Sequence, residues 1–143
     1  MAHNLPPAPS VSTDNAIAAT SPDDGASGYT AAVELLRAGR GDDAAAAFHA
    51  FLLAHPAASQ AEDASYLEAV SLARAGRTDA AGLAAEHHLA RYPASFHRKE
   101  AAILVARAAD QRGDCSKARA VLAPWLGSPD AEVRAAVASC PEP

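Results

Sequence analysis

The chain has 143 residues, of which 50% are hydrophobic and only 5% aromatic, and its formal net charge is −5 at pH 7. An acidic chain without a run of basic residues is poorly suited to binding nucleic acid. No apolar stretch approaches the ~20 residues that a helix needs to cross a bilayer, and the N-terminus lacks the charged and apolar regions of a secretory signal. Length and composition favour one alanine-rich helical domain.

The first 27 residues are rich in Pro, Ser, Thr, Ala and Asp and show almost no periodicity. Pro6, Pro7, Pro9 and Pro22 remove backbone donors and disfavour helix. We therefore predict that residues 1–27 form a disordered tail or linker. Residues 28–143 then form the folded domain.

A repeat of 37 residues runs through the rest of the chain, and it is clearest at Gly39, Gly76 and Gly113. Self-similarity at a period of this size is typical of stacked helix pairs, because each pair buries its apolar face against its neighbours. The same step relates Ala32, Ala69 and Ala106; Ala44, Ala81 and Ala118; Leu52, Leu89 and Leu126; Tyr29 and Tyr66; and Pro56 and Pro93.

Apolar residues at steps of three and four predict six helices in three pairs, and a glycine ends the first helix of each pair. Ser59 and Glu62 form a candidate capping box at the start of the second pair, and Asp114 begins the last helix of the third. Ser128 and Pro129 predict a short, half-polar terminal helix over 129–138 that closes the exposed end of the stack. The six paired helices are expected within 27–39, 42–56, 59–76, 78–93, 95–113 and 114–127.

Over residues 27–127 the repeats resemble tetratricopeptide (TPR) repeats. Small residues stand where that family packs its two helices together, Phe48 stands at its usual aromatic position, and Pro56 and Pro93 stand at its terminal proline. The repeat is longer than the family's common period of about 34 residues, and Ala85 replaces the aromatic residue in the second unit. The resemblance implies an all-α, right-handed solenoid of three TPR-like helix pairs with a C-terminal capping helix.

The segment from Gly39 to Arg77 is similar to units of bacterial cell-envelope TPR proteins, such as the Tol-Pal-associated periplasmic protein type. It joins a Phe-rich helix, a His-Pro pair and a serine to an acidic helix start. This resemblance implies an adaptor in the periplasm or cell envelope, with a cytoplasmic location left open. Similar units also end membrane-anchored regulators, so a second interpretation is a periplasmic regulatory or sensory domain of anti-sigma-factor type.

The resemblance also implies a binding surface, because the first helices of TPR pairs line a concave face. Aromatic rings flanked by arginines suit a peptide or a partner helix, and the arginines would attract an acidic segment. The alternatives are that the tyrosines pack between repeats beside solvated arginines, or that the chain associates with itself through its exposed ends. The candidate peptide-binding residues are Tyr29, Val33, Arg37, Tyr66, Val70, Arg74, Arg107 and Gln111.

The sequence contains no recognisable catalytic, metal-binding or cofactor motif. His87 and His88 are adjacent and point to different faces of a helix, and no HExxH or clustered Cys/His spacing occurs. His88 shares its register position with Phe51 and Trp125, so we expect it to be half-buried or in the core. The serines and cysteines have no nucleophile motif around them. We therefore expect a non-catalytic interaction scaffold without a metal or cofactor.

Two cysteines frame the predicted terminal helix. Cys115 begins the second helix of the third pair, and Cys140 follows the terminal helix. If these helices are antiparallel around a tight loop at Gly127 and Ser128, the two sulfur atoms come within bridging reach. We therefore predict a disulfide between Cys115 and Cys140, and two free thiols in a cytosolic protein are the alternative.

Overall fold

The computed structural model describes residues 25–143, so the predicted linker lies outside the described residues except for its last three positions. Within this range the chain forms seven α-helices and one 3-10 turn, without a strand. The predicted all-helical class is confirmed. The elements are α2 (Ala26–Arg37), α3 (Gly41–Ala54), α4 (Ala61–Arg74), α5 (Thr78–Arg91), α6 (Arg98–Gln111), α7 (Cys115–Leu122), η1 (Ala123–Trp125) and α8 (Ala131–Ala135).

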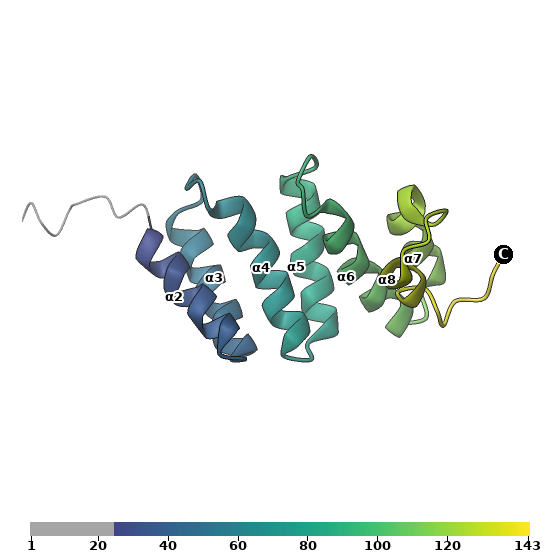
Figure 1. Ribbon diagram of the computed structural model, residues 1–143, viewed down its shortest axis with the longest axis horizontal. Helices are drawn as coiled ribbons and strands as arrows, with labels where there is room; N and C mark the ends of the chain where they lie inside the picture. The colour runs from purple at the N-terminus through teal and green to yellow at the C-terminus, as the bar shows by residue number, and fades with distance from the viewer. Residues whose placement is uncertain (1–24) are drawn as a thin grey trace, which may run out of the picture.

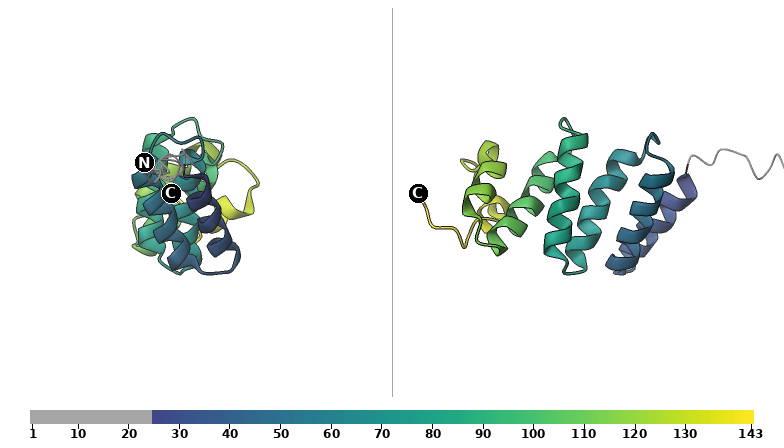
Figure 2. Two further views of the ribbon diagram at one scale, coloured as in Figure 1. Left: turned by 90° about the vertical axis from the view of Figure 1, so that its left-hand side faces the viewer. Right: turned by 180° about the vertical axis from the view of Figure 1, so that it is seen from behind.

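The helices lie side by side in sequence order along the long axis of the molecule (Figure 1). Each helix from α3 to α6 packs against the helix before it and the helix after it, and α4 also touches α6. The view from behind shows the same order, with α8 close to α6 and α7 (Figure 2). The 37-residue repeat of the sequence therefore corresponds to a repeated packing of consecutive helices.

Three glycines make equivalent turns at the ends of α2, α4 and α6. Gly39, Gly76 and Gly113 have φ angles of 76°, 77° and 75°. At the second turn the amide of Gly76 donates to the carbonyl of Ala73, and the amide of Arg77 donates to the carbonyl of Leu72. Glycine takes up this left-handed conformation without a steric penalty, which is why it ends helices in this way. The predicted helix ends at these glycines are confirmed.

Small residues lie where consecutive helices meet. The six alanines that the repeat relates within the helices are at most 1% exposed, so their predicted burial is confirmed. At Gly82 an added Cβ would lie 2.5 Å from the Cβ of Ala108, and at Gly41 it would lie 2.7 Å from the carbonyl oxygen of Ser71. Side chains of this size let the helix axes approach closely. The six alanines are Ala32, Ala44, Ala69, Ala81, Ala106 and Ala118.

The predicted capping box at the start of α4 is wrong. The helix begins at Ala61 after Gln60, and Gln60 makes no side-chain cap bond. The hydroxyl of Ser59 instead donates to the side-chain oxygen of Gln60 at 3.1 Å. Asp114 does cap α7, where its carboxylate accepts from the amide of Lys117.

The C-terminal end of the row also departs from the prediction. Ser128 does not cap the terminal helix, because its hydroxyl donates to the carbonyl of Trp125 at 2.8 Å. Asp130 caps α8 instead and accepts from the amides of Glu132 and Val133. The helix is therefore shorter than the predicted range of 129–138. Val133 is fully buried in a cluster with residues of α6 and α7, which holds α8 against the row.

No helix in the described part of the chain is long and apolar enough to cross a membrane.

Candidate functional site

A groove of about 450 Å³ lies between α4 and α6, and α8 contributes to one side of it. Its two walls are equivalent parts of the repeat, because the 37-residue step carries Tyr66 to Ile103 and Val70 to Arg107. We call this hollow the α4–α6 groove. Its lining residues are Tyr66, Val70, Ala73, Arg74, Glu100, Ile103, Leu104, Arg107 and Glu132.

The structure brings half of the predicted peptide-binding residues to this groove. Those in its lining are Tyr66, Val70, Arg74 and Arg107. Those outside its lining are Tyr29, Val33, Arg37 and Gln111. Sequence reasoning missed Glu132, because this residue comes from α8, outside the repeat. No local signal places that helix beside α6, and only its buried contacts do so.

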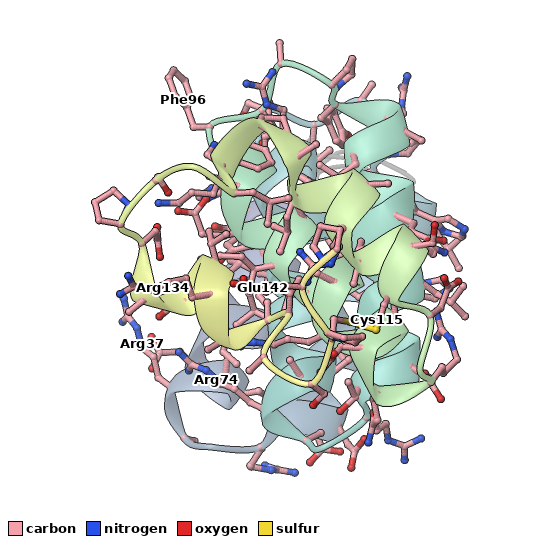
Figure 3. The ribbon with its side chains drawn as sticks, turned by 90° about the vertical axis from the view of Figure 1, so that its right-hand side faces the viewer. Arg37, Arg74, Phe96, Cys115, Arg134 and Glu142 are labelled. Atoms are coloured by element: carbon pink, nitrogen blue, oxygen red, sulfur yellow. A yellow bond between two sulfur atoms is a disulfide. The ribbon has the colours of Figure 1, made fainter. Side chains whose placement is uncertain are left out.

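The residues of α2 do not contribute to the groove. The ring of Tyr29 packs against Phe48 and Phe51, with centroids 6.0 and 5.8 Å apart, so it belongs to the core of the first pair. Arg37 is exposed and pairs with Glu34 at 3.1 Å on the same helix. Seen from the C-terminal end, Arg37 nevertheless lies on the same side of the molecule as Arg74 (Figure 3).

Tyr66 is a fixed part of the groove wall. Its ring stacks on the imidazole of His97 with centroids 4.1 Å apart and planes 6° apart. His97 lies 3.2 Å from the carboxylate of Asp63 through Nε2. Burial raises the pKa of Tyr66, and the nearby Glu100 raises it further, so the phenol stays neutral near pH 7. The groove therefore has a rigid aromatic wall that keeps a hydroxyl donor.

The charges of the groove are incompletely paired. Arg107 lies 3.9 Å from the carboxylate of Glu132, across the gap between α6 and α8. Arg74 forms no ion pair with any described residue. Oε2 of Glu100 is buried and has no hydrogen-bond partner among residues 25–143. A buried carboxylate oxygen without a partner is unfavourable, so Glu100 is a candidate to accept a hydrogen bond from a ligand in the groove.

A buried polar cluster lies next to the groove and holds His88 in the core. The side chain is fully buried, as its register position predicts, and Nε2 lies 2.9 Å from the hydroxyl of Ser95. That hydroxyl also accepts from the amide of His97 at 3.1 Å. Burial lowers the pKa of His88, because the charged imidazolium would lose its hydration.

The contact between His88 and Ser95 is not arranged as a nucleophile and its base. Such a pair needs a third group that orients the imidazole, and Nδ1 of His88 has no partner among the described residues. Ser95 is itself only 8% exposed, so a substrate would have no access to its hydroxyl. The cluster is better explained as a polar core.

The two cysteines meet at the C-terminal end of the row, with Cα atoms 5.4 Å apart in a disulfide geometry. Cys115 is the first residue of α7, and Cys140 follows α8. A carboxylate oxygen of Asp110 and the two sulfur atoms lie within 4.8 Å of one another. A metal ion would need both cysteines as free thiolates. That Cys115 and Cys140 are joined by a disulfide in the isolated protein stays a prediction.

A scan against models of known protein families gives no match, and a search of curated proteins gives none either. The assignment of a function therefore depends on the geometry of the described residues.

Proposed function

We propose that this protein is a non-catalytic interaction module that binds a peptide segment of a partner protein in the α4–α6 groove. The observation that carries the proposal is the convergence of Tyr66, Val70, Arg74 and Arg107 on one hollow of about 450 Å³. These residues come from two units of the repeat, and their side chains offer an aromatic wall, an aliphatic surface and two guanidinium groups. Aromatic residues and arginines are the residue types that contribute most to protein recognition.

The proposal includes a TPR-like architecture, a right-handed solenoid in which α2 to α7 form three helix pairs and α8 is the terminal cap. Three equivalent left-handed glycines and six buried alanines in register support this part of it.

The proposed location is the bacterial periplasm or cell envelope, where the module would serve as an adaptor. The geometry at Cys115 and Cys140 supports it, because disulfides form and persist in oxidising compartments.

The proposal is tested by selecting binders from a displayed random peptide library against the full chain and measuring their affinities for variants. Arg74→Glu reverses the charge of the groove arginine that has no ion pair. Arg91→Glu is the matched control, because Arg91 is exposed at the end of α5 and is absent from the groove lining. We expect R74E to weaken binding at least tenfold and R91E to leave it unchanged.

Both variants are first compared with the unmodified chain by circular dichroism and thermal unfolding. Peptides that bind R74E as well as the unmodified chain, but lose affinity for R91E, would place recognition on the opposite face and contradict the proposal. A library that yields no binder would contradict it as well.

A further inference from the structure

The two unpaired charges of the α4–α6 groove have opposite signs. Glu100 lines the groove and has a buried carboxylate oxygen without a partner, and the exposed guanidinium of Arg74 has no ion pair among the described residues. The remaining two charges of the lining, Arg107 and Glu132, already face each other. A purely acidic segment would therefore meet an unpaired carboxylate, and a purely basic one would meet an unpaired guanidinium.

The unpaired charges lie toward opposite ends of the groove. Glu100 lies beside Tyr66, whose pKa it raises, and the 37-residue step makes it equivalent to Asp63 of α4. Arg74 is the last residue of α4. At a rise of 1.5 Å per helical residue, Arg74 lies about 12–16 Å further along the helix axis than Tyr66 and Asp63. A ligand that satisfies both charges must cover this distance.

The separation of the two charges fits an extended ligand. A helix about 10 Å in diameter would place only one of its faces in this open groove. An extended segment rises about 3.3 Å per residue and presents every second side chain to the same face. Side chains at positions i and i+4 are then about 13 Å apart, which matches the separation of the two charges.

Val70 offers an aliphatic surface between the two charges. Ile103 lies behind it and is only 3% exposed, and the pair of Arg107 and Glu132 lies on the other side of the groove. A ligand side chain at position i+2 would lie over this surface, where an apolar group buries area at little cost.

We infer that the α4–α6 groove binds an extended protein segment with a basic residue, an aliphatic residue and an acidic residue at alternate positions. The basic side chain pairs with Glu100, the aliphatic one covers Val70, and the acidic one pairs with Arg74. The inference rests on the proposed function, because it names the kind of segment that the same groove binds. The sequence alone suggested a purely acidic segment, because it considered the arginines without Glu100. A segment with charges of both signs takes its place here.

The test uses four acetylated and amidated pentapeptides titrated into the full chain labelled with 15N, with chemical shifts followed by NMR. Two peptides carry both charges, Lys-Ser-Val-Ser-Glu and its reverse Glu-Ser-Val-Ser-Lys. The two controls are Lys-Ser-Val-Ser-Lys and Glu-Ser-Val-Ser-Glu. We expect one of the mixed peptides to bind at least tenfold more tightly than either control, with the largest shifts at the amides of α4 and α6.

Charge reversal in the protein sharpens the test. With Arg74→Glu the peptide with two lysines becomes the preferred ligand, and with Glu100→Lys the peptide with two glutamates does so. Arg91→Glu leaves the order of affinities unchanged. Because Glu100 is partly buried and its replacement can affect folding, R74E alone is sufficient to decide the outcome.

Equal binding of all four peptides in the groove, or a preference for the doubly acidic one, would overturn the inference and leave the proposed function standing. Groove shifts that depend on protein concentration without any peptide would identify a second copy of the chain as the occupant, which also overturns it. If none of the peptides shifts the groove while library-selected peptides do, the charge pattern is wrong. If neither class does so, the proposed function fails as well.

Discussion

The first and second helix pairs share one backbone register but have different cores. In the first pair, Phe48 and Phe51 of α3 pack against Tyr29 of α2. The equivalent positions in the second pair are Ala85 and His88, and the latter packs against Tyr66 with centroids 5.9 Å apart. One pair has an apolar aromatic core, and the other has a histidine core with hydrogen bonds.

The core of the second pair also includes a ring that the first pair lacks. Where the first pair has a phenyl ring at Phe48, the second has a methyl group at Ala85, and both positions are fully buried. His97, from the loop before α6, stacks on Tyr66, and its equivalent in the first pair is Gln60, which has no ring. The contact of Tyr92 with His88 is common to both pairs, because His55 lies 5.5 Å from Phe51. The repeat therefore specifies where helices meet, while neighbouring loops and side chains decide what fills the space between them.

The largest effect is expected in the apolar core of the first pair. Phe48→Ala gives the first pair the small residue of the second without the ring of His97 that packs there, so we expect a loss of about 3–5 kcal/mol in the free energy of unfolding. Urea unfolding measures it. Phe96→Ala is the matched control, because Phe96 is 99% exposed and its side chain extends into solvent (Figure 3). Equal losses for the two variants would contradict the assigned core.

The next effect concerns the third pair, where the predicted disulfide would help to hold α8. In protein isolated under oxidising conditions, we expect Cys115 and Cys140 to resist alkylation until a reductant is added, as intact mass will show. The bond closes a loop of about 25 residues, so Cys140→Ser should lower the free energy of unfolding by roughly 3 kcal/mol. Two thiols that react freely before reduction would contradict the bridge.

The third prediction concerns the pH dependence of stability, which His88 of the second core should cause and the apolar first core should not. Burial lowers the pKa of His88 below its value in the unfolded chain, about 6.5, so the unfolded state binds more protons between the two values. The free energy of unfolding should therefore fall as the pH decreases below about 6.5. His88→Phe copies Phe51 of the first pair and should reduce this dependence. The measurement is urea unfolding at pH 8 and pH 5.5, and identical pH dependences would show that His88 is not responsible.

The smallest effect tests what the pairs have in common. An added Cβ at Gly39 or Gly76 meets no atom within 4 Å, so replacement by alanine costs only the left-handed backbone conformation. We expect Gly39→Ala and Gly76→Ala each to lower the free energy of unfolding by about 1–2 kcal/mol. Thermal unfolding measures both. A large difference between them would show that the two turns are not equivalent.

Local and periodic features were predictable from the sequence. Glycine is the residue that readily takes up positive φ, so three glycines at equal spacing predict three equivalent helix ends. Alanine at fixed steps of three and four predicts close helix contacts, and the burial of Ala69 and Ala81 bears this out. Helix starts were less predictable, because Ser59 and Ser128 carry the side chain of a cap but bond elsewhere.

By itself, the sequence determined the helical class, the repeat, the turns and the small residues at the helix contacts, since each depends on near neighbours or on a regular period. Only the tertiary structure decided that Asp130 caps α8, that Glu132 faces Arg107, and that Glu100 lies in a groove with an oxygen unpaired. These features join residues from separate helices. Their relative positions depend on how side chains fill the space between helices, and no local pattern records that.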